Sequence, residues 1–388
     1  MNEPLSLYLH IPFCASRCGY CDFNTYAGKE SLIPDYLKAI QAEILISRDL
    51  LVLNNPVHSI YFGGGTPSLL PAAGINTLME TIRTAFDVRE DAEVTLEMNP
   101  GDADADLVRQ IRHAGINRVS LGMQSADPRE LTLMDRRHTP EKTLEAVEHL
   151  KSAGINNFSL DLIYGFPQQT MESWRKSLET ALSLDPAHIS LYALSVEEGT
   201  PLKRRIELGQ LDPPDDDRTA EMYQAAEEIL EKDGFLHYEI SNWARTAEVQ
   251  SRHNTQYWLT QPYLGLGAGA HGNVYHIRTK NHTSIETYIE AMQKAENHKT
   301  GFPAASEVIP QTELMEMQDF MILGLRLLQT GASPERFKQR FSVTQEEIFH
   351  YQIERLLAKG LIEYGPERQL LLRKDRIFIS NQVFMEFI

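Results

Sequence analysis

The sequence predicts an α/β fold, in which a partial (β/α)6 barrel precedes a C-terminal, mainly helical, winged-helix-like domain. Short β-rich runs alternate with amphipathic helical runs through the first half of the chain, which is typical of a parallel sheet. Residues 114–122 and 153–161 resemble each other, because in both a glycine ends a helix and an isoleucine opens the next strand. After residue 311, three helical runs come before a short hairpin.

The barrel is expected to contain six strands and five connecting helices. The strands are predicted at residues 5–10, 57–63, 93–98, 117–122, 156–163 and 188–194. The helices between them are predicted at residues 32–53, 71–86, 105–114, 140–153 and 171–184. A complete barrel of this type has eight strands, so this one is predicted to be partial, with its ligands at the carboxyl ends of the strands.

The regular alternation stops after a capped helix that is predicted to end at Lys232. We expect three parts: a core barrel at residues 1–235, a linking segment at 236–305 and a C-terminal domain at 306–388. The linking segment has no clear period over residues 238–272, and a connecting helix is predicted at 279–299. The C-terminal domain is predicted to have helices at 312–328, 333–341 and 345–359, then a hairpin of strands 361–364 and 370–372.

Composition and charge argue against several classes of protein. The net charge of −17 disfavours a nucleic acid or an anionic membrane surface as partner. The apolar runs are too short to span a bilayer and no signal-peptide pattern is present, so we expect no transmembrane segment and a cytoplasmic location. The three cysteines are clustered, which excludes a disulfide framework and suits a reducing compartment.

The cysteines carry the strongest chemical signal in the chain. Cys14, Cys18 and Cys21 are spaced i, i+4 and i+7 beside Pro12, and such spacing is not that of buried core cysteines. One interpretation is a zinc site with His10 as its fourth ligand. The interpretation that we favour is a metal-binding loop for a 4Fe–4S cluster, in which one iron has no protein ligand, because such clusters normally take four cysteines.

The residues around the cysteines also resemble a known family. The run is Tyr8-Leu9-His10-Ile11-Pro12-Phe13-Cys14, continued by Cys18 and Tyr20-Cys21. It looks like the opening of radical S-adenosylmethionine (SAM) enzymes and, more narrowly, is similar to the oxygen-independent coproporphyrinogen III oxidase family. The resemblance covers nearly the whole chain and implies that SAM chelates the open iron and is cleaved to a 5′-deoxyadenosyl radical. It also implies an electron donor of the flavodoxin or ferredoxin type.

Polar residues and glycines at the ends of successive strands fit a SAM pocket, because a barrel assembles its site at that end. The glycines at 63–65 let the backbone approach a ligand closely, and the resemblance implies contact with the SAM amino group. It also implies that Glu97 lies near the SAM ribose. The residues assigned to SAM in this way are Tyr8, Tyr20, Gly64, Gly65, Thr66, Glu97, Gln124, Arg136, Asp161 and Ala193.

Two departures separate this chain from the oxidases that it resembles. In those oxidases a further cysteine follows the third ligand by two residues, and Phe23 occupies that position here. Their N-terminal extension is also missing, because the motif already begins at Tyr8. Both departures argue against coproporphyrinogen dehydrogenase activity, and no catalytic residue is assigned.

A second motif points to haem. The run His253-Asn254-Thr255-Gln256-Tyr257-Trp258 resembles the HNxxYW signature of the haem chaperone branch of the family. A neutral imidazole is a common axial haem ligand, and the two aromatic rings offer flat apolar surface to a porphyrin. The alternative is that His253 forms hydrogen bonds within a structured segment while the aromatic residues pack in the core. His271, in the glycine-rich run 265–272, is a second candidate ligand.

The expected function is that of a haem chaperone, which binds a 4Fe–4S cluster, SAM and haem and transfers haem to an acceptor protein. One alternative is an oxygen-independent coproporphyrinogen III oxidase, which performs radical SAM oxidative decarboxylation in haem biosynthesis. The other is a different radical SAM enzyme that modifies a tetrapyrrole. All three belong to porphyrin metabolism, and related scaffolds host several such reactions.

Overall fold

The computed structural model describes residues 3–51, 55–295 and 302–388. Its main feature is a twelve-stranded sheet, in which seven neighbouring strands are parallel. In spatial order these are β11 (Tyr263–Leu266), β1 (Leu5–Ile11), β4 (Val57–Gly64), β5 (Val88–Met98), β6 (Arg118–Gln124), β7 (Phe158–Tyr164) and β8 (His188–Ala193). The last six are the six predicted strands in their predicted order, so the α/β fold with a partial barrel is confirmed.

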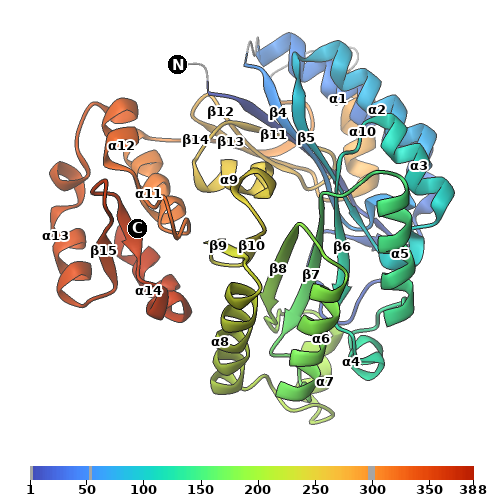
Figure 1. Cartoon of the computed structure of the whole chain (residues 1–388). Coiled ribbons are helices and arrows are strands. Elements are labelled where there is room, and N and C mark those ends of the chain that lie inside the picture. The colour runs from blue at the N-terminus through green and yellow to red at the C-terminus, as the bar shows by residue number, and fades with distance from the viewer. Residues whose placement is uncertain (1–2, 52–54, 296–301) are drawn as a thin grey trace.

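Helices of the first half of the chain follow the strands, and α1, α2, α3, α5 and α6 cover the outer face of the sheet (Figure 1). The repeated helix ends are confirmed, because Gly115 and Gly154 have left-handed φ angles of +106° and +77°. The predicted helix at 32–53 lies along α1, and its residues 52 and 53 are outside the described residues. The helices are α1 (Ile33–Leu51), α2 (Ala72–Ala85), α3 (Ala105–Ala114), α4 (Pro128–Leu133), α5 (Pro140–Ser152), α6 (Met171–Ser183), α7 (Pro201–Glu207) and α8 (Asp216–Lys232).

The sheet continues at both edges beyond the predicted strands. Beside β8 lie β10 (Asn242–Ala244) and β9 (Leu236–Glu239), and beside β11 lie β12 (His271–Val274), β13 (Ile277–Asn281) and β14 (Ala305–Pro310). The predicted helix at 279–299 is wrong at its start, because pairing with β12 and β14 makes residues 277–281 a strand. Helix α10 (Ile285–Ala295) begins after it, and residues 296–299 are outside the described residues.

The C-terminal elements form a group of their own, coloured orange to red in Figure 1. Three helices come first, α11 (Glu313–Gly324), α12 (Pro334–Phe341) and α13 (Gln345–Ala358). The antiparallel hairpin of β15 (Ile362–Tyr364) and β16 (Leu370–Leu372) and the short α14 (Ser380–Phe384) follow. This order agrees with the predicted winged-helix-like arrangement, although the first helix ends at Gly324 and not at residue 328. Among the described helices, none combines the length and the apolar character needed to cross a membrane.

Shorter elements complete the described chain. Helix α9 (Arg252–Trp258) lies between the barrel and the C-terminal elements (Figure 1). A two-stranded parallel ladder joins β2 (Phe13–Cys14) to β3 (Tyr26–Ala27). The 3-10 helices are η1 (Glu30–Leu32), η2 (Pro67–Leu69), η3 (Pro100–Asp102), η4 (Ala247–Val249), η5 (Lys374–Ile379) and η6 (Met385–Phe387).

A fully enclosed carboxyl group on α1 joins three parts of this fold. Glu43 accepts hydrogen bonds from the Gly267 N–H at 2.7 Å, from the Asn281 amide at 2.7 Å and from the Tyr288 hydroxyl at 2.6 Å. These donors favour the carboxylate, but burial has the larger effect and raises the pKa of Glu43 from 4.5 to about 7. The folded chain therefore holds a proton at Glu43 over a pH range in which the unfolded chain has released it.

We predict that this proton makes the stability of the apo-protein depend on pH. The folded pKa lies above the unfolded value, so the stabilisation is complete below pH 4.5 and is lost as the pH rises through about 7. The free energy of unfolding should fall by up to about 3 kcal/mol between about pH 5 and about pH 8. Urea unfolding of the wild type and of Glu43→Gln at both pH values measures it. The free energy of unfolding should fall more steeply with pH in the wild type than in Glu43→Gln. An equal dependence on pH in the two proteins would contradict the assignment of the proton to Glu43.

Candidate functional site

A cavity of about 390 Å³ lies at the carboxyl ends of the barrel strands. Glu97 on β5, Gln124 on β6, Asp161 on β7 and Ala193 on β8 reach it from four neighbouring strands. Its volume is in the range of sites for cofactor-sized ligands. The residues predicted for the cluster and for SAM that line it are Cys14, Cys18, Cys21, Tyr20, Gly64, Gly65, Thr66, Glu97, Gln124, Arg136, Asp161 and Ala193.

The cysteine loop is held at its ends and in its middle. Cys14 belongs to β2, which pairs with β3 on the far side of the loop. In the middle, the Cys21 N–H donates to the Cys18 carbonyl at 3.2 Å. The Gly19 carbonyl accepts from the Leu202 N–H at 2.8 Å, and this bond joins the loop to α7. Cys14 is buried and the other two thiols are half-buried, so all three sulfur atoms stand at the wall of the cavity.

The surroundings of the thiols keep two of them protonated and place hydrogen-bond donors beside two of the sulfur atoms. Burial raises the pKa of Cys14 and of Cys21, so both thiols keep their protons when no cation is near. Two donors already point at sulfur: the Thr66 hydroxyl lies 3.6 Å from Cys14 Sγ, and the Arg136 guanidinium lies 3.5 Å from Cys18 Sγ. Hydrogen bonds to cluster sulfur ligands are a regular feature of iron–sulfur sites, so the loop fits that group.

The geometry favours the cluster over the zinc alternative. Within the described ranges, no three His, Cys, Asp or Glu side chains lie close enough together to hold one metal ion. A cubane binds each thiolate at a different iron, so its ligands stand further apart than those of a single zinc. His10 is also committed elsewhere, because Nε2 donates to the Asn24 carbonyl at 2.9 Å and Nδ1 accepts from the Tyr8 hydroxyl at 3.0 Å.

The glycine run after β4 packs against the start of the cysteine loop. The Gly65 N–H donates to the Ile11 carbonyl at 2.9 Å, and the Thr66 N–H donates to the Phe13 carbonyl at 2.8 Å. A Cβ on Gly65 would lie 2.7 Å from the Phe13 carbonyl oxygen and 2.8 Å from that of Ile11, which is too close for any side chain. Gly64 has a φ of +112°, and its Cβ would overlap the His10 ring. The run therefore has to be glycine for steric reasons.

We predict that Gly65→Ala disturbs both the cluster and the SAM pocket. The added methyl group meets backbone oxygens, which cannot rotate away, so the cysteine loop and the Gly64–Thr66 segment must separate. SAM affinity should fall by about tenfold or more, and the iron bound after reconstitution should fall with it. Equilibrium dialysis with SAM and an iron assay measure the two effects. Gly101→Ala is the matched control, because its Cβ meets nothing nearer than 3.5 Å, and an equal loss there would contradict the prediction.

Two carboxyl groups lie at the inner end of the cavity. Glu97 accepts from the Tyr61 hydroxyl at 2.8 Å and from the Gly64 N–H at 3.0 Å. Burial raises the pKa of Glu97 to about 7, against the effect of these two donors. Asp161 accepts from the Ser120 hydroxyl at 2.8 Å, and burial raises the pKa of Asp161 as well. Both groups are able to accept hydrogen bonds from the hydroxyl or ammonium groups of a ligand.

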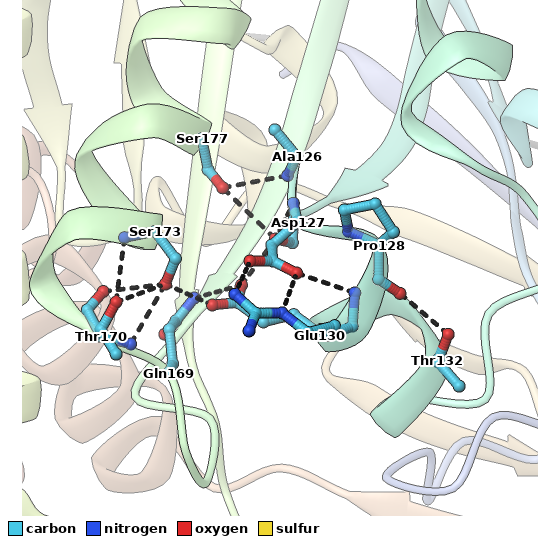
Figure 2. A network of polar contacts seen from close by, with 11 residues as sticks. Ala126, Asp127, Pro128, Glu130, Thr132, Gln169, Thr170, Ser173 and Ser177 are labelled. Carbon is cyan, nitrogen blue, oxygen red and sulfur yellow. Dashed lines mark hydrogen bonds and ion pairs between the residues drawn. The ribbon is translucent and has the colours of Figure 1, made fainter.

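A network around Glu130 fixes the loop that brings Gln124 and Arg136 to the cavity. Figure 2 shows Glu130 of α4 between the loop that follows β6 and the start of α6. Its carboxylate accepts from the hydroxyl groups of Ser125 and Ser173 and from the Gln169 amide. Arg136 is not part of this network. Its guanidinium, which points at Cys18 Sγ, also donates to the Gly122 carbonyl at 2.9 Å.

Several residues that reasoning from the sequence did not assign also line the cavity. Ser120 and Gly122 precede the predicted Gln124 by four and two residues on β6. Because every second residue of a strand faces the same side, the sequence could have predicted that they line the cavity too. Glu130 does not line the cavity itself, and little in the sequence signals its role, because two of its three partners, Gln169 and Ser173, are distant in the sequence. Other unassigned lining residues include Arg17, Thr25, Tyr61, Asn99, Asp135, Arg137 and Tyr192.

Tyr8 is the one predicted SAM residue that does not line the cavity. It lies opposite Tyr61 in the register of β1 and β4, and its ring centre is 6.1 Å from that of Tyr61. Tyr61 does line the cavity, so Tyr8 lies beside a lining residue without lining the cavity itself. Its hydroxyl donates to His10, so Tyr8 supports the cysteine loop indirectly.

The HNxxYW segment forms α9, whose first turn closes the amino end of the barrel. His253 is only 1% exposed, and its ring nitrogens are hydrogen-bonded to the Ser59 hydroxyl at 3.0 Å and to the Tyr257 hydroxyl at 2.9 Å. The N–H groups of Arg252 and His253 both donate to the Glu93 carboxylate at 3.0 Å. The His253 ring also stacks on Tyr61 with 4.9 Å between centres.

In this structure His253 does not present a free imidazole, and its assignment as a haem ligand stays a prediction. An axial ligand needs an unoccupied ring nitrogen and space above it, and here both nitrogens have partners inside the protein. Tyr257 packs edge-on against Tyr263, and Trp258 lies under the Arg326 guanidinium at 4.1 Å. Asn254 is half-buried in the same helix and does not line the cavity. All four residues take part in packing here, and their assignment to haem stays a prediction.

Comparisons with known proteins agree with this architecture. Residues 8–181 match the model of the radical SAM superfamily. A protein named "Heme chaperone HemW" from Mycobacterium tuberculosis strain H37Rv is 37% identical over 385 residues, which cover 98% of this chain and 94% of that protein. Proteins of the same name from Bacillus subtilis and Escherichia coli K12 are 34% and 31% identical and cover 99% and 97% of this chain. The aligned regions also span 99% of the Bacillus subtilis protein and 97% of the Escherichia coli protein.

The solved structure of coproporphyrinogen III oxidase (HemN) from Escherichia coli has the same fold. The two chains superimpose with a TM-score of 0.84 over 99% of this chain and 90% of that one, at 24% identity. This likeness is evidence for the fold alone. The relatives that align from end to end are more informative, because the cysteine loop, the strand-end residues and the α9 motif all lie within the aligned length. The chain therefore belongs to the radical SAM superfamily and, within it, to the HemW family.

Proposed function

We propose that this protein is a haem chaperone, which holds a 4Fe–4S cluster and SAM in the barrel, binds haem and transfers it to an acceptor protein. The observation that supports this most is the end-to-end similarity to several relatives that are named as haem chaperones. The three thiols at the wall of a cavity lined by the predicted SAM residues support the cofactor part. The cargo, haem, is a substrate that has to be taken up and released.

Each residue around the cavity has a proposed part in holding these groups. Cys14, Cys18 and Cys21 bind the cluster, and Arg136 donates toward one of its thiolates. Tyr20, Gln124 and Ala193 line the pocket for SAM, together with the backbone of Gly64, Gly65 and Thr66. Glu97 and Asp161 accept hydrogen bonds from the polar groups of SAM. When bound, SAM and the reduced cluster supply a 5′-deoxyadenosyl radical.

The finer parts of the proposal concern organisation and partners. We propose a core barrel at residues 1–235, a linking segment at 236–305 and a C-terminal domain at 306–388. The reductant of the cluster would be a flavodoxin- or ferredoxin-like protein. A cytoplasmic location is proposed because three clustered, partly accessible thiols need a reducing compartment.

One experiment separates the proposal from the oxidase alternative. The reconstituted protein is titrated anaerobically with haem and, separately, incubated with coproporphyrinogen III, SAM and dithionite. We expect a haem absorption band that saturates at a fixed haem-to-protein ratio and no protoporphyrinogen. Phe23, which is 65% exposed at the cavity rim in place of the additional cysteine, is the observation against decarboxylation. Formation of protoporphyrinogen, or failure to bind haem, would overturn the proposal.

A further inference from the structure

Helix α9 has only seven residues, and charged side chains from other parts of the chain hold it at both ends. Isolated helices of this length are not stable in water, so the position of α9 depends on what holds it. At its amino end, the Glu93 carboxylate of β5 accepts from the N–H groups of Arg252 and His253 at 3.0 Å. An anionic group suits this end, because the first N–H groups of a helix are unpaired and carry partial positive charge.

Arginines of the C-terminal elements hold the carboxyl end of α9. Arg336 of α12 donates to the Leu259 carbonyl at 2.8 Å. Arg340, one turn further along α12, donates to the Thr260 carbonyl at 2.9 Å and to the Thr260 hydroxyl at 2.8 Å. Cationic donors suit this end, because the last carbonyl groups of a helix are unpaired and carry partial negative charge. The end of α9 therefore depends on its contacts with α12.

Thr260, which follows the end of α9, has a strained backbone. Its φ of +53° lies in the left-handed region, which a β-branched residue such as threonine disfavours. Strained residues of this kind persist only where surrounding contacts hold them, and they are common in switch regions. The two hydrogen bonds from Arg340 are such contacts. Their loss would let Thr260 relax and the end of α9 move.

A third arginine, Arg326, follows α11 and joins α9 to the edge of the sheet. Its guanidinium lies 4.1 Å from the centre of the Trp258 ring and 3.6 Å from the Glu239 carboxylate of β9. This contact is imperfectly satisfied, because three of its buried atoms form no hydrogen bond with the described residues: Arg326 Nε, Trp258 Nε1 and Glu239 Oε2. Buried polar atoms without partners cost free energy. Exposure of these atoms to water would therefore offset part of the cost of opening the contact.

Another face of α9 leads to the cavity that is assigned to SAM. The His253 ring stacks on Tyr61 with 4.9 Å between centres, and its Nε2 is hydrogen-bonded to the Tyr257 hydroxyl at 2.9 Å. Tyr61 lines the cavity, and its hydroxyl donates to Glu97 at 2.8 Å. A continuous series of contacts thus runs from the arginines of the C-terminal elements through α9 to a carboxyl group of the SAM pocket.

We propose that the C-terminal elements control SAM binding through α9, by means of a clamp that consists of Arg326, Arg336 and Arg340. In the closed clamp, which is the state of this structure, α9 supports Tyr61 and Glu97 in the positions that SAM needs. When the clamp opens, Thr260 relaxes, the end of α9 moves and SAM binds more weakly. The coupling is reciprocal, so SAM in turn favours the closed clamp. The inference rests on the proposed function, because it assigns a means of regulation to that SAM site.

The test is SAM calorimetry on the reconstituted full-length protein and its variants. Arg340→Ala should weaken SAM binding by about fivefold or more, because it removes two hydrogen bonds that hold Thr260. Arg340→Lys keeps a cationic donor and should recover part of the affinity. Arg355→Ala is the matched control, because Arg355 lies on α13 and pairs with Glu386 instead of α9. It should bind SAM as the wild type does.

Trp258 reports the state of the clamp, because the other two tryptophans, Trp174 and Trp243, are fully buried. Quenching of tryptophan fluorescence by acrylamide should increase in Arg340→Ala. In the wild type, SAM should decrease the quenching, since it favours the closed clamp. A purely structural role of Arg340 would lower the stability of the protein without making the quenching depend on SAM.

The outcomes distinguish this inference from the proposed function. If the wild type binds no SAM, the proposed function itself fails. If the wild type binds SAM and Arg340→Ala binds it equally tightly, or if SAM leaves the quenching unchanged, the clamp is wrong while the SAM site stands. The iron content should be equal in all variants, so that weaker SAM binding does not reflect a lost cluster.

Two further variants keep the inference testable. If circular dichroism shows that Arg340→Ala is not folded, Arg336→Ala, which removes only the bond to Leu259, replaces it with the same expected direction. Combining the arginine variant with Tyr61→Phe tests the route through Tyr61. The double variant should lose less SAM affinity than the sum of the two single losses, and losses that add in full would overturn the inference.

Discussion

Replacing Cys18 with serine is expected to abolish the iron–sulfur cluster and, with it, the binding of SAM. Only three cysteines are present, so the loss of one leaves two thiolates for a cluster that already lacks one protein ligand. Cys18 is half-buried, and its side chain contacts the Arg136 guanidinium, not the apolar core. The variant should therefore fold, and the loss should be confined to the cofactors.

The measurements are iron and sulfide content, visible absorption after anaerobic reconstitution, and retention of SAM on gel filtration. We expect cluster content below about a tenth of the wild type and no SAM retained. The thermal unfolding midpoint of the two apo-proteins should agree. Ser16→Ala is the control, because Ser16 lies on the same loop and lines the same cavity. A cluster that assembles fully in Cys18→Ser would contradict the ligand assignment.

The barrel was predictable because its signals are local and repeated. Each parallel strand is a short apolar run between amphipathic helices, and glycines such as Gly115 and Gly154 mark the ends of two of those helices. The strands β9 to β14, which extend the sheet beyond the six predicted strands, were not predictable in the same way. They are three to six residues long, and partners that are distant in the sequence stabilise them, as with Tyr263 beside β1. Residues 279–281 follow a helix-like pattern, but pairing within the sheet decides their conformation.

The site was predictable where strand order alone brings residues together. Glu97 and Gln124 lie at the ends of β5 and β6, where parallel strands meet at one edge of the barrel, and Asp161, in the middle of the neighbouring β7, lines the same cavity. Burial depth is harder to predict, because it depends on which layer of the barrel a residue reaches. Tyr8 lies opposite Tyr61, which lines the cavity, but does not line it itself. Tyr257 is a local partner of the His253 ring, but Ser59, which bonds the other ring nitrogen, and Glu93, which accepts from its N–H, precede it by 194 and 160 residues, so a local pattern does not reveal that the ring is enclosed.

Replacing His253 with alanine is expected to destabilise the barrel and to weaken SAM binding, while leaving the haem spectrum unchanged. The change removes the partner of two hydroxyl groups, those of Ser59 and Tyr257, and opens a cavity under the Tyr61 ring. Unsatisfied buried groups and a cavity together typically cost about 3 kcal/mol. The effect on SAM follows from Tyr61, whose hydroxyl holds Glu97 at 2.8 Å. Urea unfolding, SAM calorimetry and the Soret band measure the three results, and a lost Soret band would restore His253 as a haem ligand.

The comparison with Tyr61→Phe tests the route of this effect. That variant removes the hydrogen bond to Glu97 but keeps the ring that stacks on His253, so it should weaken SAM binding with little loss of stability. If His253 acts on SAM through Tyr61, the double variant should bind SAM no more weakly than the weaker of the two single variants. If the two losses of SAM affinity add in full, His253 affects SAM binding through residues other than Tyr61. The stability losses, in contrast, should come mainly from His253, because the enclosed imidazole joins α9 to β4 at the amino end of the barrel.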